Sequence, residues 1–91
     1  MGELNVRVEG TPNPNAAKFV LDRRVLGEGS RSYFHSRDAE GDPLAERLFA
    51  IAGVRALFMV EDFITITKCE EADWSEIVED ARAAIRSELE D

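Results

Sequence analysis

The sequence predicts a two-layer α+β fold, in which two helices lie on one face of a mainly antiparallel sheet. Residues 4–9 alternate apolar and polar side chains with period two, as a half-buried strand does. Residues 43–52 and 74–89 carry apolar side chains at helical spacing. Two apolar runs, 54–60 and 63–68, are separated by two residues, which is typical of a hairpin. The predicted order is β-β-(β)-α-β-β-α.

The size of the chain favours one domain. It has 91 residues, of which 44% are hydrophobic, so we expect residues 1–91 to share a single core. The longest apolar run, Ala56–Val60, is too short to cross a bilayer, and we expect neither a membrane span nor a signal peptide. The single cysteine, Cys69, cannot form an internal disulfide, which favours a reducing, cytoplasmic location.

The charge is distributed unevenly. The net charge is −8, and residues 38–91 hold fifteen Asp/Glu against five Lys/Arg. Nucleic acids and anionic membranes attract basic patches, so this balance argues against both as partners. It fits a basic protein surface or a cation better, or alternatively a solvated acidic face that keeps a small domain soluble.

The first two strands are joined by a proline-rich turn. Residues 10–15 contain two prolines and two asparagines, which push the chain out of helical geometry and form side-chain turns. A second strand follows at residues 17–22. Because the connection is short, we expect this strand to pair antiparallel with the first.

Residues 23–42 carry weaker signals. Val25 and Leu26 are candidates to extend the second strand, and residues 27–29 read as a turn. A short third strand is expected at residues 32–35, where two aromatic side chains lie side by side in the sequence.

The first helix has both standard start signals. Asp42 is a capping carboxylate, Pro43 suits the first helical position, and Gly53 is expected to stop the helix after three turns at residues 43–52. In the hairpin that follows, the first arm (54–60) is apolar on both sides. We therefore expect it to be central in the sheet, with one face under the helices and the other at least partly covered.

The last helix begins after Asp73, with Glu76 three residues on in the pattern of a capping box. Trp74, Ile77 and Ile85 fall on one apolar stripe, while charged residues occupy the other side. This helix is therefore expected to pack by one face and to expose an acidic one.

Motifs for catalysis and metal binding are missing from the sequence. It has no phosphate loop, nucleophile elbow, His-Glu zinc motif or Cys-x-x-Cys pair. Zinc or an iron–sulfur cluster needs about four side-chain ligands, whereas Cys69 and His35 would supply two. His35 has no nucleophile or carboxylate near it in sequence, so it is expected to be a surface residue.

The segment just before the last helix contains four residues that each have two possible interpretations. Cys69 is either an unreactive, half-buried thiol or a transient metal or sulfur contact. Glu70, Glu71 and Asp73 form either a solvated loop or a hard-oxygen metal site, although the spacing of a calcium loop is missing.

Two further features could serve packing or recognition. Trp74 is expected either to anchor the last helix on the sheet or to contact a partner. The segment of Thr11, Pro12, Asn13, Pro14 and Asn15 is either a rigid structural corner or a loop that displays amides for recognition.

Taken together, these segments resemble the N-terminal domain of Nfu/NifU-like iron–sulfur scaffold proteins. The resemblance runs in order from about residue 9 to residue 86, leaving out 23–41. It is carried by Thr11–Ala16 followed by Lys18-Phe19, Asp42–Ala45 with Leu48-Phe49, Gly53-Val54, Phe58, Asp62–Lys68 and Asp73-Trp74.

The resemblance implies the fold and a role connected with iron–sulfur cluster assembly. In the scaffold proteins a second domain with a Cys-x-x-Cys pair holds the cluster, and this sequence has no such pair. We therefore expect no enzyme and no cofactor held by the isolated chain, and a cluster only through a partner or dimer.

The leading hypothesis is an accessory domain that docks an iron–sulfur carrier or a recipient protein. Its partner-binding residues would be Thr11, Pro12, Asn13, Pro14, Asn15, Lys18, Glu76, Glu79 and Asp80. The alternatives are a homodimer that binds iron or a cluster directly through Cys69, and a small enzyme of unknown reaction. The sequence leaves the oligomeric state open.

Overall fold

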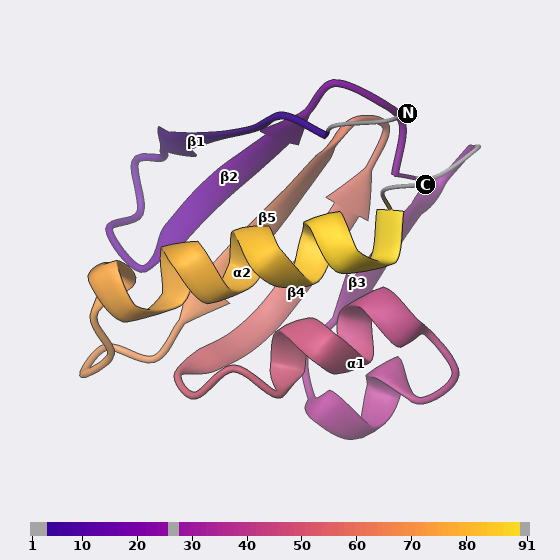
Figure 1. Cartoon of the computed structure of the whole chain (residues 1–91). Coiled ribbons are helices and arrows are strands. Elements are labelled where there is room, and N and C mark those ends of the chain that lie inside the picture. Colours follow the sequence, from indigo (N-terminus) through magenta and orange to yellow (C-terminus); the bar gives the residue numbers. More distant parts are fainter. Residues whose placement is uncertain (1–3, 26–27, 90–91) are drawn as a thin grey trace.

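The computed structural model describes residues 4–25 and 28–89 and shows a five-stranded antiparallel sheet with two α-helices in front of one face (Figure 1). The α+β class and the predicted order of elements are confirmed. The elements are β1 (Val6–Gly10), β2 (Ala16–Leu21), β3 (Ser30–Tyr33), the short 3-10 helix η1 (Ser36–Ala39), α1 (Pro43–Phe49), β4 (Val54–Val60), β5 (Phe63–Lys68) and α2 (Trp74–Leu89).

The strands lie in the order β1-β2-β5-β4-β3, and every neighbouring pair is antiparallel. Two hairpins, β1/β2 and β4/β5, meet where β2 pairs with β5. Phe19 of β2 lies opposite Ile64 of β5, which lies opposite Met59 of β4. As predicted, β4 is an interior strand, with β5 on one side and β3 on the other.

The core lies between the sheet and the helices. Alternate residues of each strand point to the helices, so the period-two pattern of the sequence becomes one buried layer. The helix α2 closes this layer along its length and α1 lies beside it (Figure 1). The buried side chains of the two helices are those of Leu44, Ala45 and Leu48 in α1 and Ile77, Ala81, Ala84 and Ile85 in α2.

The first helix is shorter than predicted. Asp42 caps α1, since its Oδ1 accepts a hydrogen bond from the Ala45 backbone 3.2 Å away. The helix ends at Phe49 instead of residue 52. Tighter turns then reverse the chain into β4, with Ile51 N–H donating to Leu48 O and Val54 N–H to Ile51 O. Gly53 completes this reversal with φ of +97°, a conformation that favours glycine.

The region between β2 and α1 also differs from expectation. The third strand spans Ser30–Tyr33 instead of residues 32–35, so Phe34 and His35 leave the sheet. The strand β2 ends at Leu21, and Val25 donates its N–H to Glu61 O, 2.6 Å away. Leu26 and Gly27 lie outside the described residues, and with them part of the predicted extension and turn.

The face of the sheet away from the helices carries aromatic side chains. Phe58 of β4 and Phe63 of β5 have ring centroids 6.3 Å apart, and Nζ of Lys18 lies 4.2 Å from the centroid of Phe63. Phe34 is 68% exposed and Phe58 is 38% exposed. Within the part of the chain that the structure describes, no helix is long and apolar enough to cross a membrane.

Candidate functional site

The Thr11–Asn15 loop is held by its own side chains. Thr11 Oγ1 accepts from the Asn13 N–H at 3.1 Å and lies 2.8 Å from Asn13 O and 3.0 Å from Ala16 O. Asn13 Oδ1 accepts from the Asn15 N–H at 2.9 Å, and Asn13 O accepts from the Ala16 N–H at 3.0 Å. Asn side chains form such local turns readily. The loop therefore has a defined shape, with Pro12, Asn13 and Pro14 exposed.

Lys68 at the end of β5 ties this loop to the sheet. Its Nζ donates to Asn15 Oδ1 at 3.0 Å and its backbone N–H donates to Asn15 O at 2.7 Å. The same Nζ lies within hydrogen-bond distance of the carbonyls of Cys69 and Glu70, at 3.3 Å and 3.4 Å. Lys68 is 8% exposed, so these oxygens replace the water that an ammonium group would otherwise bind.

Trp74 ties the loop to the first turn of α2. Its indole Nε1 donates to Pro14 O at 3.0 Å, and its ring centroid lies 5.9 Å from Lys68 Nζ. Trp74 is half-buried and also packs against the core, so the anchoring interpretation describes its position. The loop and the start of α2 consequently form one continuous surface.

The acidic side chains expected to bind a partner lie on the outside of α2. Glu76, Glu79 and Asp80 are exposed, and Glu79 pairs with Arg82 at 3.4 Å. Asp73 accepts from the backbone N–H of Ser75 at 3.0 Å and from its hydroxyl at 2.9 Å. These bonds, the backbone one foremost, lower the pKa of Asp73 and keep it ionised.

Lys18 lies apart from these residues. It belongs to β2 and alternates with buried Ala17 and Phe19, so it stands on the face away from the helices, beside Phe63. The structure thus brings the loop and α2 together but leaves Lys18 on the other side of the sheet.

Cys69 follows β5 and is half-buried. Its N–H donates to Gly53 O at 2.8 Å, and it lines a small hollow with Arg55, Glu70 and Glu71. Among residues 4–25 and 28–89, no three His, Cys, Asp or Glu side chains come together as a metal site. The described residues of one chain therefore do not fit an iron–sulfur cluster, which takes about four thiolate ligands.

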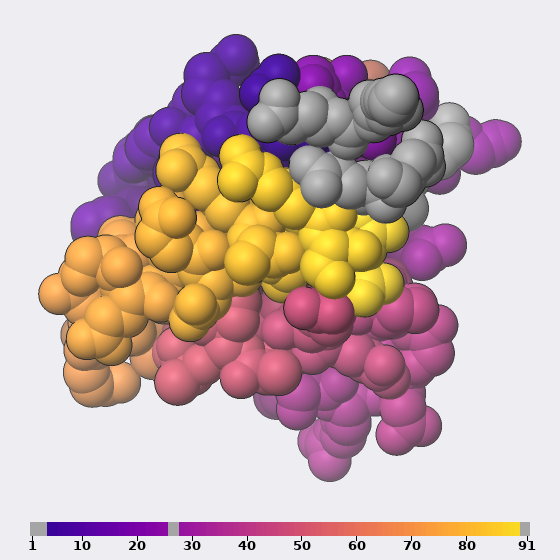
Figure 2. All heavy atoms as spheres, viewed as in Figure 1, coloured from indigo at the N-terminus to yellow at the C-terminus, as the bar shows by residue number. Residues whose placement is uncertain are grey.

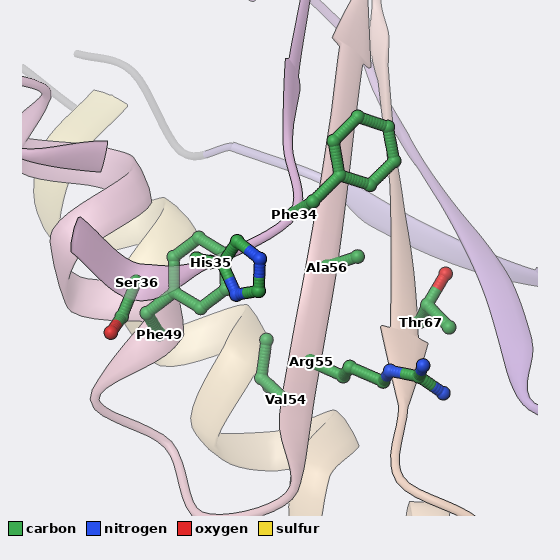
Figure 3. Close-up of a pocket in the computed structure, with 8 residues that line it drawn as sticks. All are labelled: Phe34, His35, Ser36, Phe49, Val54, Arg55, Ala56 and Thr67. Atoms are coloured by element: carbon green, nitrogen blue, oxygen red, sulfur yellow. The ribbon is translucent and has the colours of Figure 1, made fainter. Parts of the chain in front are cut away.

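His35 lines a hollow with a volume of about 630 Å³. Figure 3 shows His35, Ser36 and Phe49 along one side, and Phe34, Ala56, Arg55 and Thr67 along the other. None of the residues lining this hollow is a carboxylate or a cysteine. The hollow therefore lacks the paired acid and base that catalysis by His35 would require.

A polar cluster organises the start of α1. Asp42 Oδ2 accepts from Tyr33 Oη at 2.7 Å and from Arg31 Nη1 at 3.2 Å. Burial alone would raise the pKa of Asp42, but the bonds from Tyr33, the Ala45 backbone and Arg31 outweigh it, and the pKa is lowered. Burial, followed by the bond to Asp42, raises the pKa of Tyr33. This cluster fixes the helix start and is remote in sequence from the loop.

The fold, together with comparison to known proteins, identifies the family of the chain. Its five-stranded antiparallel sheet with two helices on one face defines a small two-layer α+β domain. Residues 6–91 match the family described as scaffold protein Nfu/NifU N terminal. The chain belongs to this family, and the resemblance stated from the sequence is confirmed.

Relatives and solved structures agree with this assignment. The chain is 46% identical over 81 residues to the NFU1 iron-sulfur cluster scaffold homolog, mitochondrial, of Drosophila ananassae, covering 88% of this chain and 28% of that protein. It resembles the solution structure of a NifU-like protein from Saccharomyces cerevisiae with a TM-score of 0.83 and 25% identity, over 94% of this chain and 78% of that one. The crystal structure of protein SAV1430 from Staphylococcus aureus gives a TM-score of 0.74 and 26% identity, over 88% and 96%. The chain spans less than a third of the curated relative's length.

Proposed function

We propose that this chain is a non-enzymatic, cytoplasmic accessory domain of iron–sulfur cluster assembly that docks a cluster carrier or a recipient protein. The docking surface consists of the Thr11–Asn15 loop together with Glu76, Glu79 and Asp80 of α2. Membership of the Nfu/NifU N-terminal family supports the connection with cluster assembly. The cluster itself is cargo in this proposal and is held by the partner.

The bond from Trp74 Nε1 to Pro14 O is the observation that carries the proposal. It joins an exposed loop to an exposed acidic helix, so both can meet one partner together. The internal bonds of Thr11 and Asn13 hold the loop before binding. A preorganised loop loses less conformational entropy on association than a flexible one.

The acidic residues have a different role from the loop. Exposed charges attract an oppositely charged partner over distances of about 10 Å at moderate salt, which accelerates encounter. Glu76, Glu79 and Asp80 should therefore increase the association rate with a basic carrier. The loop, in contact with the partner, should control the dissociation rate.

Binding kinetics with a Cys-x-x-Cys carrier from the same organism test this division. Asn13→Asp preserves the Oδ1 that accepts from Asn15 but removes the amide donor. We expect it to raise the dissociation rate about two- to tenfold at high salt, as the loss of one hydrogen bond does. Glu79→Lys should slow association mainly at low salt.

Arg37→Met is the control, because Arg37 is exposed in η1, outside the proposed docking surface. It should leave both rates near those of the parent. If Asn13→Asp and Asn13→Ala both bind like the parent, the loop is a structural corner alone and this docking surface is wrong.

A further inference from the structure

A cleft lies between the docking loop and α2. It is lined by residues of β1, β2 and α2 and by Thr11, Asn13 and Pro14 of the loop. Most of the lining is apolar, with the side chains of Val8, Pro14, Ala16, Ala17, Trp74 and Val78, and Glu9 is its one charged residue. In Figure 2 the indigo and purple atoms of β1 and its loop border the orange atoms of α2 at this end of the molecule.

The cleft is small. Its volume of about 290 Å³ lies at the lower end of the range of ligand pockets, about 300 to 1,000 Å³, and has room for one large side chain. Burying one large apolar side chain in such a recess is a common way to anchor a protein partner.

The walls are fixed before any partner arrives. Trp74 is held by its bond to Pro14 O, and the loop is held by Thr11 and by Lys68 through Asn15. Val78 is half-buried and packs against the core. Closing the cleft would therefore break these hydrogen bonds, of which the one between Lys68 and Asn15 is partly buried, so the cleft stays open to an incoming group.

The surroundings of the cleft are negative. Residues 68–80 contain six Asp or Glu and a single Lys, and that Lys68 is buried against Asn15. Glu9 lines the cleft and pairs with Arg7 at 2.8 Å, and Glu79 pairs with Arg82. These pairs partly neutralise Glu9 and Glu79, whereas the other carboxylates of residues 68–80 keep the net charge of this segment negative. This charge favours basic residues next to the group that enters.

We propose that the cleft receives one aliphatic or aromatic side chain of the partner, flanked in the partner by Lys or Arg. This inference rests on the proposed docking function and specifies the chemistry that the partner must carry. The apolar walls provide the anchor, and the acidic end of the domain selects a basic context for it.

Short synthetic peptides are the probe. One carries a central Leu flanked by Lys; a second replaces the Leu with Ser, and a third replaces each Lys with Glu. Trp74 is the only tryptophan of the chain, so its fluorescence reports on the cleft. The Leu/Lys peptide should shift the Trp74 emission and perturb the methyl NMR signals of Val8 and Val78. The affinity of the Ser and Glu peptides should be lower by a factor of about ten or more.

Two variants sharpen the test. Val78→Phe fills the cleft and should abolish the response to the peptide, whereas Ala83→Phe, on the exposed side of α2, should not. The methyl signals of the parent protein give the same answer if Val78→Phe does not fold. Equal binding of the Leu and Ser peptides, or perturbations centred on Phe34 and Phe58 instead, would overturn the proposal.

Competition separates this inference from the proposed function. Excess Leu/Lys peptide should displace the carrier. If the carrier binds through the loop but the peptide neither binds in the cleft nor displaces the carrier, the cleft inference is wrong and the docking function stands. If the peptide occupies the cleft but no carrier binds, the docking function is wrong and the chemistry of the cleft is supported.

Discussion

Lys68 Nζ donates a hydrogen bond to Asn15 Oδ1 across 3.0 Å, although the two residues are 53 positions apart. Lys68 occupies an inward-facing position of β5, after Ile64 and Ile66, where an apolar side chain would be expected. The ammonium group is accommodated because loop oxygens surround it at the edge of the core. One cation thus fixes the position of the loop relative to the sheet.

Removing this cation should destabilise the protein. We expect Lys68→Met to lower the free energy of unfolding by about 1–3 kcal/mol, because Asn15 Oδ1 and neighbouring carbonyls lose their donor. In a double-mutant cycle, Asn15→Ala should cost much less in the Lys68→Met background than in the parent. Urea denaturation followed by circular dichroism measures each step, and strictly additive effects would contradict the coupling.

Acid should weaken the start of α1. The pKa of Asp42 is lowered in the folded state, so its contribution to stability is present above the unfolded pKa near 4 and is lost as the pH falls through the folded value. The free energy of unfolding should therefore decrease below about pH 4. Asp42→Asn should flatten this dependence, and Tyr33→Phe should reduce it partly, in denaturation curves recorded across that range.

Gly53 should tolerate no side chain. A Cβ at this position would meet the Ala72 Cβ at 2.7 Å, and φ is +97°. Gly41 has φ of +92° with nothing within 4 Å of the added Cβ, so Gly41→Ala serves as the control. We expect Gly41→Ala to cost about 1–2 kcal/mol, and Gly53→Ala to cost about 1–3 kcal/mol more through overpacking. Equal losses in urea denaturation would mean that Ala72 moves aside freely.

The core can be tested at a fully buried helical position. Ile85 is fully buried, and Ile85→Ala should lower the free energy of unfolding by about 2–5 kcal/mol. Phe49 is half-buried and lines the hollow beside His35. Phe49→Ala should therefore leave a smaller cavity and lower the free energy of unfolding by less per atom removed than Ile85→Ala. A loss below about 1 kcal/mol for Ile85→Ala would contradict this description of the core.

The isolated chain should not hold a stable iron–sulfur cluster. Even two copies would provide two Cys69 thiolates of the usual four or so. Anaerobic reconstitution, absorption spectroscopy and an iron count are the measurements, with Cys69→Ser as the control. A stoichiometric cluster that disappears in Cys69→Ser would favour the homodimer alternative over the docking function.

Most of the architecture could be predicted because local patterns and tertiary packing agree. Val54–Val60 and Phe63–Lys68 have the predicted bounds. The two-residue turn sets their register from Val60 opposite Phe63 to Ala56 opposite Thr67, and an irregularity shifts it between Ala56 and Val54. The end of α1 could not be predicted, because residues 50–52 continue the helical pattern of apolar side chains. Their turn is imposed by the need to enter β4 beside the start of α2.

The candidate site was predictable in its parts and less so in its connections. Thr11–Asn15 and the acidic residues of α2 stand out in the sequence, but the bonds from Lys68 and Trp74 to the loop are long-range. One signal could have identified Lys68, namely its place in the inward-facing series Ile64, Ile66, Lys68. The separation of Lys18 from the loop follows from the same alternation in β2.

The exposed phenylalanine rings indicate a second role for the negative charge of the chain, which is to oppose self-association. Phe58 of β4 and Phe34, which follows β3, leave apolar surface in water, and exposed apolar surface favours self-association. At pH 7 the net charge of −8 should make copies of the chain repel one another, whereas near pH 4.6, where the sequence composition gives no net charge, that repulsion should vanish while the rings stay exposed. We therefore expect the carboxylates to keep copies of the chain apart at neutral pH and to fail in this role as the pH approaches that point.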